Sequence, residues 1–327
     1  MKTIKELEEF YYGDLESTLD NFEKGRKKAI INMVKKLIVC ILSFGLINYV
    51  LIIINIGNLS TIIFLIAFLF HFFFAQSVYA SAISDYNDKF KNSIIEPLIK
   101  SMNESFVYCK DKHISIETFM ESNLFRRPDK LTGDDYVVGE IDGVEIEFSD
   151  VKAQTISSGT INTDRPVEYN TFFEGLFIKS NFNKHFEGKT FVYSSYYDEN
   201  SENNSFVFSY SKSSSSSEYE QIKMDNAQFT KEFNVYSTDQ IEARYILTPS
   251  MMERLLEFKR KSIYPLYISF VNDCIHIVIC TNKNNFEANL FQSVTNHNAA
   301  FEYILHINLA STLVNNLKLN QKLWGKR

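Results

Sequence analysis

Cysteine is scarce in this sequence and follows no pattern. The four cysteines, Cys40, Cys109, Cys274 and Cys280, are scattered over 327 residues. Proteins stabilised by disulfides carry regularly spaced cysteines, whereas free thiols persist in a reducing cytosol. The sequence therefore gives no sign of a disulfide framework and favours a cytoplasmic location for most of the chain.

Short catalytic and phosphate-binding motifs are absent as well. No two of the eleven glycines form G-x-G, and neither G-x-x-x-x-G-K-[ST], HExxH, CxxC nor G-x-S-x-G occurs. These patterns position phosphates, metals or nucleophiles in well-known sites. Sites can also form without a local signature, so their absence lowers the expectation of an enzyme without excluding one. We predict no cofactor.

An excess of positive charge is also missing. The formal net charge is −6, whereas nucleic-acid binding usually requires a basic face. The sequence therefore predicts no nucleic-acid partner.

Two long apolar runs near the N-terminus are the strongest signal that is present. They are Leu37–Ile56 and a run from Thr61 to about Ile83, and neither contains Asp, Glu, Lys or Arg. A helix needs about 20 apolar residues to cross the hydrocarbon core of a bilayer. Only four residues separate the runs, so they predict a transmembrane helical hairpin at residues 37–83, with spans at 37–56 and 61–83.

The charges beside the runs predict the orientation of this hairpin. Six basic residues precede the first run: Lys24, Arg26, Lys27, Lys28, Lys35 and Lys36. Short flanks rich in Lys and Arg remain cytoplasmic. We therefore expect a multi-pass membrane protein with both termini in the cytoplasm. The same six residues are candidates for contact with anionic lipid, although ordinary flanking of a span explains them as well.

Amphipathic helices are expected on both sides of the hairpin. Apolar residues recur every three or four positions before the first span and again after the second, from Tyr86 to Met102. This spacing is typical of helices with one apolar face. We predict a cytoplasmic amphipathic helix and basic juxtamembrane segment at residues 1–36, and a stalk helix at residues 84–109.

Residues 110–327 predict a cytoplasmic α+β domain, in which helices pack on an antiparallel sheet. Asp142-Gly143 and Asn272-Asp273 are expected to turn two hairpins, and Thr248-Pro249 is expected to begin a helix. Further strands are predicted at residues 169–182, 189–193, 205–210, 220–224 and 229–236, and polar loops at 198–204 and 212–218. A final amphipathic helix carries Phe301 to Leu317.

The strongest ligand-binding candidates lie just before the helix that is expected to begin at Thr248-Pro249. Arg244 is a single cation in an apolar neighbourhood, with Asp239 and Tyr245 close by in sequence. A buried Arg needs a carboxylate or phosphate partner. The structural alternative is an internal ion pair with Glu242, Asp239 or Glu232.

Two other groups of residues contain the side chains that bind metals. Asp134 and Asp135, followed by Glu140 and Asp142, are weaker candidates for Mg²⁺ or Ca²⁺, because they lack the regular ligand spacing and a turn explains them equally well. Cys274, His276 and Cys280 alternate on one strand, but ~20 Å separates the two cysteines, too far for one ion. We therefore predict no metal and interpret the Cys-His-Cys set as structural.

Polar residues inside the apolar runs call for a partner of their own. Asn48 and His71 lie at similar depth, about ten residues from the connecting turn. Polar groups within a membrane are costly and usually bond to one another. We predict an intramembrane polar pair between Asn48 and His71 that fixes the register of the hairpin.

Two stretches of the sequence resemble a known family. They are FFEGLFIKSNFNKHFEGKTFV (172–192) and EFNVYSTDQIEARYILTPSMMERLLEF (232–258). They are similar to the bacterial domain of unknown function 3137 family, as are residues 121–125 and 133–154. Asp150 departs from the pattern, where Glu is expected. The family has no assigned activity, so the resemblance implies paired membrane spans before a soluble domain and no catalytic residue.

With this resemblance, the leading hypothesis is a protein of the bacterial inner membrane with a hairpin-anchored cytoplasmic binding or scaffolding domain. This domain would hold a protein or small ligand at the membrane, acting with a protein partner or as a homo-oligomer. The alternative is a membrane-tethered enzyme acting on a phosphate or lipid substrate, with Arg244 working beside Asp134, Asp135 or Asp239.

Overall fold

The computed structural model describes residues 2–54, 57–158, 167–182, 185–195, 219–262, 264–311, 313–317 and 319. Its contacts divide the chain into two compact units. One comprises Met1–Leu7, Leu98–Phe286 and Glu302–Arg327, and the other comprises Glu8–Pro97 and Glu287–Phe301. The predicted strand at 205–210 and the polar loops at 198–204 and 212–218 lie outside the described residues.

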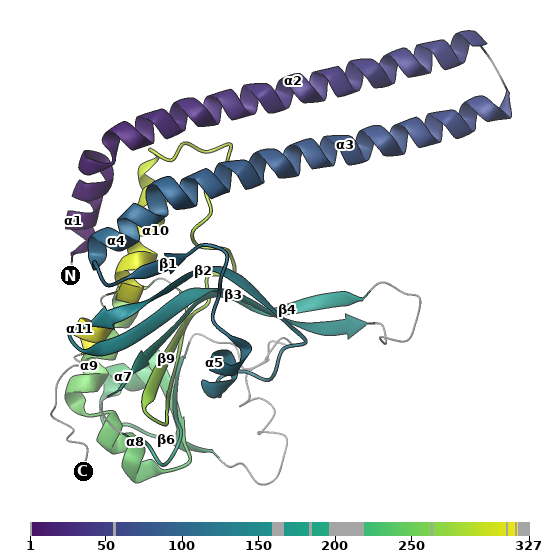
Figure 1. Cartoon of the computed structure of the whole chain (residues 1–327). Helices are drawn as coiled ribbons and strands as arrows, with labels where there is room; N and C mark the ends of the chain where they lie inside the picture. Colours follow the sequence, from purple (N-terminus) through teal and green to yellow (C-terminus); the bar gives the residue numbers. More distant parts are fainter. Residues whose placement is uncertain are drawn as a thin grey trace. The chain divides into compact units, whose positions relative to one another are not determined.

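The unit that contains Glu8–Pro97 is built on two long helices. The N-terminal helix α1 (Ile4–Glu9) leads through a π-helical turn (Phe10–Asp14) into α2 (Glu16–Ile54). The second long helix, α3 (Asn58–Phe90), lies antiparallel beside α2 (Figure 1). Both are long and apolar enough to cross a membrane, and only 6% of the most apolar stretch of each is buried. Length and composition alone indicate membrane association only weakly.

The helix after the second apolar run is shorter than predicted. A π-helical turn (Lys91–Ile95) follows α3, and α4 (Glu96–Met102) ends the helical stretch. The predicted stalk helix at 84–109 is therefore wrong at its C-terminal end, where β1 (Val107–Cys109) pairs with the next strand. Strand pairing of these residues outweighs the helical spacing that precedes them.

The other unit contains a nine-stranded antiparallel sheet with the order β1-β2-β3-β4-β9-β8-β5-β7-β6. Its remaining strands are β2 (Lys130–Ile141), β3 (Val144–Ser158), β4 (Glu168–Asn181), β5 (Thr190–Ser194), β6 (Glu220–Ile222), β7 (Phe233–Ser237), β8 (Leu266–Val271) and β9 (Cys274–Ile279). The predicted α+β class is thereby confirmed.

Turn chemistry explains the two predicted hairpins. Asp142 and Gly143 both have positive φ, 50° and 80°, as a two-residue type I′ turn requires. Asn272, with φ of 56°, turns the β8–β9 hairpin in the same left-handed region. Asparagine, aspartate and glycine tolerate this conformation better than other residues do.

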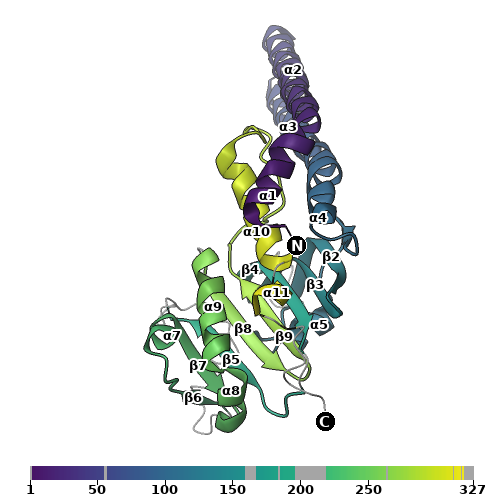
Figure 2. The same ribbon diagram turned by 90° about the vertical axis from the view of Figure 1, so that its left-hand side faces the viewer.

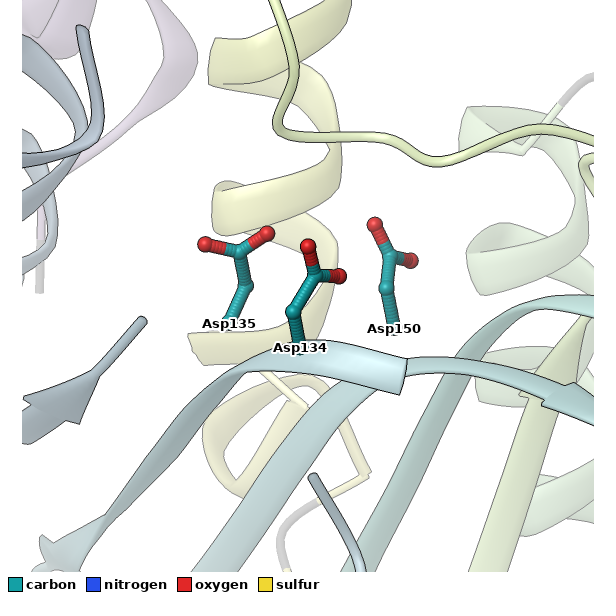
Figure 3. Close-up of side chains that lie close together, drawn as sticks. All are labelled: Asp134, Asp135 and Asp150. Carbon is teal, nitrogen blue, oxygen red and sulfur yellow. The ribbon is translucent and has the colours of Figure 1, made fainter. Parts of the chain in front are cut away.

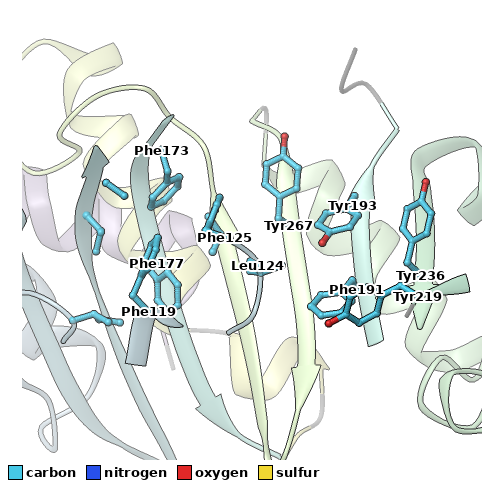
Figure 4. Packing of buried hydrophobic residues seen from close by; sticks show 14 residues of the cluster. Phe119, Leu124, Phe125, Phe173, Phe177, Phe191, Tyr193, Tyr219, Tyr236 and Tyr267 are labelled. Atoms are coloured by element: carbon cyan, nitrogen blue, oxygen red, sulfur yellow. The ribbon is translucent and has the colours of Figure 1, made fainter. Parts of the chain in front are cut away.

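Helices lie on both faces of the sheet. The helix α5 (Ile116–Glu121) packs on one face, where Phe119 and Phe125 contact Phe173 and Phe177. On the opposite face lie α9 (Pro249–Lys261) and α11 (Leu313–Leu317) (Figure 2). The first face carries a continuous aromatic cluster that extends to Tyr236 (Figure 4). The other helices of the chain are α7 (Ala227–Glu232), α8 (Gln240–Ile246) and α10 (His297–Ser311).

Capping side chains determine where α9 and α7 begin. Thr248 caps α9 by accepting from the backbone N–H of Met251, as predicted. Asn226 caps α7 by accepting from the N–H groups of Gln228 and Phe229. The predicted strand at 229–236 is therefore wrong in its first half, because this cap begins a helix that ends only at Glu232.

Candidate functional site

Three aspartates gather where β2 and β3 pair. One carboxylate oxygen from each of Asp134, Asp135 and Asp150 lies within 4.8 Å of the others. Figure 3 shows their side chains rising from the two neighbouring strands on the same side. Asp135 and Asp150 are buried, whereas Asp134 is partly exposed. Burial of like charges so close together is unfavourable unless each carboxylate has donors.

An irregularity in β2 brings the three side chains to one place. The register between β2 and β3 shifts between Asp134 and Val137, and Asp135 has φ of 57°. A bulge of this kind redirects a side chain that regular alternation would send to the other face. Gly133 permits the close approach of the strands, because a Cβ there would lie 2.1 Å from the carbonyl oxygen of Asp150.

Hydrogen-bond donors reach each carboxylate from distant parts of the chain. The Asp150 carboxylate accepts from the backbone N–H of Asn285 at 2.5 Å and from the side-chain Nδ2 of the same residue at 2.5 Å. Asp134 accepts from Asn284 Nδ2, at 3.0 and 3.1 Å. The Tyr108 hydroxyl donates to Asp135. These donors satisfy carboxylate oxygens that would otherwise be close together and partly buried without partners.

A groove of about 200 Å³ opens beside Asp134 and Asp150. Lys152 and Lys283 line it together with Glu174, and Lys152 lies 2.9 Å from Glu174. Carboxylate and amide oxygens are the ligands that Mg²⁺ and Ca²⁺ prefer. If any residues of this unit hold a hard cation, Asp134, Asp135 and Asp150 are the set with the right chemistry.

Sequence reasoning found two members of this cluster and missed the third. It grouped Asp134 and Asp135 with Glu140 and Asp142, but Glu140 pairs with Glu145 at the far end of the β2–β3 hairpin. That end is about 20 Å away along the strand, at ~3.3 Å per residue. Asp150 could have been found by counting back from the Asp142-Gly143 turn, which places it opposite this part of β2.

Arg244 does not occupy the buried position that its sequence context suggested. Its guanidinium group is 46% exposed, donates from Nη2 to the Lys223 carbonyl at 3.1 Å and lies 4.0 Å from Asp225. The expected internal ion pair is therefore wrong. Asp239 caps α8 instead, accepting from the N–H groups of Ile241 and Glu242.

The remaining neighbours of Arg244 are also engaged elsewhere or exposed. Glu242 accepts from the backbone N–H groups of Glu187 and Gly188, at 3.1 and 2.8 Å. Tyr245 is 50% exposed. Arg244 and Tyr245 therefore offer a surface rather than a pocket, at the edge of the sheet formed by β6.

The family match falls on the second half of the chain. Residues 171–319 match the family described as "Protein of unknown function (DUF3137)". These residues belong to the DUF3137 family. The match includes Arg244, Asn284 and Asn285, but it begins after the three aspartates on β2 and β3. It therefore confirms the resemblance inferred from the sequence and assigns no activity to the site.

Comparison with other proteins adds little to the DUF3137 match. No curated protein matches the sequence. Among solved structures, the crystal structure of the mycobacterial trehalose monomycolate transport factor A, TtfA, is similar at 11% identity with a TM-score of 0.36, covering 67% of this chain and 93% of that chain. A similarity this distant carries no argument about the present protein.

The Cys-His-Cys set within the DUF3137 segment has the surroundings of a structural group. His276 is 1% exposed, and its Nδ1 lies 3.3 Å from the Ser269 hydroxyl. Burial, with a smaller contribution from the Lys179 charge, lowers the pKa of His276 to about 3. Burial likewise raises the pKa of the Cys280 thiol. A neutral histidine and a protonated thiol suit a packed core.

The predicted pair of Asn48 and His71 does not form. Asn48 Nδ2 donates to the Phe44 carbonyl within its own helix, at 2.7 Å. His71 Nε2 instead lies 2.9 Å from the Ser43 hydroxyl on α2. The partner of His71 is thus one and a half helical turns away from the residue predicted, because similar depth does not place two side chains on facing sides of their helices.

One of the six basic residues before the first apolar run has partners within the chain. Arg26 donates to Glu23 through two nitrogens and to the Leu290 carbonyl at 3.1 Å. Its role is therefore internal. The five lysines of this group make no ion pair with any residue that the structure describes.

Proposed function

We propose that this protein is a bacterial inner-membrane protein whose α2–α3 hairpin holds a cytoplasmic binding or scaffolding domain at the bilayer. The observation that carries the proposal is the exposure of large apolar side chains along both helices. Ile52 is 76% exposed and Phe70 is 65% exposed, for example. Exposing apolar surface to water costs ~25 cal/mol of free energy for each Å². Lipid chains would remove this cost by covering the surface.

The charge distribution supports an orientation with both termini in the cytoplasm. Lys35 and Lys36 precede the first apolar run, Lys89 follows the second, and no charged residue lies at residues 57–60 between them. Basic flanks are retained on the cytoplasmic side. The sheet domain would then lie in the cytoplasm, where its three free cysteines, Cys109, Cys274 and Cys280, remain reduced.

Membrane insertion and orientation are tested together. The tagged full-length protein is expected in the membrane fraction after alkaline carbonate washing. A reporter active only outside the cytoplasm should work when inserted near residue 58 and fail when fused to the C-terminus. Release by carbonate would refute insertion, and the reverse reporter pattern would refute the orientation.

The binding role is tested by crosslinking in cells followed by mass spectrometry. Arg244→Ala removes an exposed cation at the β6 edge of the domain, and Lys231→Ala removes an exposed cation on α7 as a matched control. A discrete partner that is lost with R244A and kept with K231A would support a binding domain that uses this edge. Crosslinks between copies of the chain, unchanged by either variant, would favour a homo-oligomer instead.

The enzyme alternative depends in part on Arg244 lying near Asp134 or Asp135. Arg244 contacts Lys223 beside β6, whereas Asp134 lies on β2, and six strands separate β2 from β6 in the sheet order. Neighbouring strands lie about 4.8 Å apart, so the seven spacings from β2 to β6 correspond to about 34 Å of sheet. A single active site that combines Arg244 with Asp134 or Asp135 is therefore not favoured.

A further inference from the structure

A groove of about 380 Å³ lies between α2 and α3 where the first apolar run begins. Five residues of α2 and three of α3 line it, with Lys35 and Lys36 at one end. The lining residues are Lys35, Lys36, Val39, Cys40, Ser43, Phe70, His71 and Phe74. From Lys36 to Ser43 the groove follows α2 for about 10 Å, at 1.5 Å per residue.

The groove is cationic at one end and apolar along its walls. Lys35 and Lys36 are exposed and have no ion pair in the described part of the chain. Beyond them, the walls are formed by Val39, Phe70 and Phe74, which are 65%, 65% and 44% exposed. A ligand that fits must therefore carry a negative charge at one end and an apolar chain at the other.

The polar groups at the floor of the groove already have partners inside the protein. The Ser43 hydroxyl donates to the Cys40 carbonyl at 2.8 Å and contacts His71 Nε2, while His71 Nδ1 lies 2.7 Å from the Ala67 carbonyl. These contacts leave the floor with little need for a polar ligand. The part of the occupant that lies over it should therefore be hydrocarbon.

A second groove extends the cationic end away from the apolar run. It has a volume of about 610 Å³, also lies between α2 and α3, and shares Lys36 with the first groove. Lys28 and Lys89 line it, and Asp85 is the one carboxylate among its lining residues. It offers space and positive charge for a headgroup, with Lys36 at the junction.

We propose that these joined grooves bind one anionic phospholipid, with its phosphate at Lys35 and Lys36 and an acyl chain between Phe70 and Phe74. The proposal rests on the proposed membrane insertion of the hairpin. It differs from general attraction between basic flanks and anionic lipid, because it selects two of the six basic residues and adds an apolar wall. A lysine near an anionic surface contributes about a five-fold gain in binding, so the pair contributes about 25-fold.

The test uses the purified full-length protein in dodecyl maltoside, with native mass spectrometry to count bound lipids. Phosphatidylglycerol and phosphatidylcholine of equal chain length are titrated separately. The wild type should retain one phosphatidylglycerol at concentrations where phosphatidylcholine does not bind. In the Lys35→Gln/Lys36→Gln variant the apparent affinity for phosphatidylglycerol should fall by about 25-fold.

Matched variants separate the site from general electrostatics. Lys24→Gln/Lys27→Gln removes the same charge from the same basic segment but changes no residue that lines either groove, and it should retain the lipid. Val39→Trp narrows the groove with all charges kept and should weaken binding at least ten-fold. Leu42→Trp places the same bulk at a position that is 67% exposed and outside the groove, and it should not.

Each outcome bears on one claim. Equal losses in the two double-lysine variants, or equal binding of both lipids by the wild type, would overturn the proposal. Binding of free glycerol phosphate as tightly as phosphatidylglycerol would also overturn it, because the acyl chain would then have no role. If the protein is carbonate-resistant in membranes but binds no lipid here, the membrane proposal stands and the lipid site falls. If it is not in membranes at all, the proposed function itself fails.

Discussion

Two buried histidines should make the stability of the sheet domain depend strongly on pH. Burial lowers the pKa of His276 to about 3, with a further contribution from Lys179. Burial also lowers the pKa of His306 to about 4, assisted by Lys283. Their side chains are 1% and 0% exposed, so the folded protein holds both imidazoles in the neutral form.

The direction of the effect follows from proton linkage. An unfolded histidine binds a proton below about pH 6.5, whereas these two remain neutral in the folded state down to about pH 4. Stability is therefore full above pH 6.5 and is lost as the pH falls toward the folded pKa values. One pH unit corresponds to about 1.4 kcal/mol for each group, so each histidine should cost about 2 kcal/mol at pH 5, and both together about 4 kcal/mol.

Chemical unfolding of the full-length protein in dodecyl maltoside, followed by far-ultraviolet circular dichroism, measures this effect. The free energy of unfolding should fall by about 4 kcal/mol between pH 7.5 and pH 5 in the wild type. It should fall by about 2 kcal/mol in either His276→Leu or His306→Leu, and by much less in the double variant. His185→Leu, which replaces a histidine whose side chain is 68% exposed, serves as the control. The reasoning would be refuted by a double variant with the same pH dependence as the wild type.

Two further predictions concern single positions. A Cβ at Gly175, where φ is 154°, would lie 2.1 Å from the Ile279 carbonyl oxygen, so Gly175→Ala should lower the free energy of unfolding by at least about 3 kcal/mol. Gly143→Ala, at φ of 80° with nothing within 4 Å, should cost only about 1 kcal/mol in the same denaturation experiment; similar losses would contradict the steric argument. Ser43→Ala removes the bond to His71 and should weaken the association of α2 with α3 by about 0.6 kcal/mol, measured by steric trapping in detergent. A loss above 2 kcal/mol would show that this bond does more than fix the register.

The parts of the fold that were predicted correctly depend on neighbouring residues. The Asp142-Gly143 turn requires only that two adjacent residues accept positive φ. The cap at Thr248 requires only a hydroxyl three residues before the N–H that it accepts from. The strand predicted to include Phe229 is wrong because of another local signal. The cap at Asn226 begins a helix there and outweighs the alternation of apolar residues.

The parts of the site that were missed depend on residues far apart in the sequence. Asp150 meets Asn285 across 135 positions, and Asp134 meets Asn284 across 150. No local pattern encodes such contacts. The exposure of Arg244 could not be predicted either. The sequence pattern of a single cation among apolar residues is the same whether the side chain is buried or donates to the Lys223 carbonyl at the edge of a sheet. The predicted domain limits at residues 36 and 83 stay a prediction.

The segment Glu287–Phe301 shows why membrane topology and folding units need not share boundaries. The sequence assigned it to the domain after the hairpin, yet it belongs to the same compact unit as α2 and α3. Asn87 accepts from the Ala288 N–H at 3.0 Å, and the Tyr11 hydroxyl donates to the Val294 carbonyl at 2.9 Å.

Side chains strengthen the same attachment. Arg26 donates to the Leu290 carbonyl, and the ring of Tyr79 stacks on Phe291 with 6.4 Å between centroids. Because the DUF3137 match spans residues 171–319, it includes this segment but not the helices that cover it. A fragment cut at the predicted limit of residue 84 or 110 would therefore remove some of these partners and expose Leu290 and Val294, which are 2% exposed in the intact chain. The helices at the start of the chain thus complete the fold of a segment near its end. This conclusion depends on contacts within the protein and not on the proposed membrane insertion.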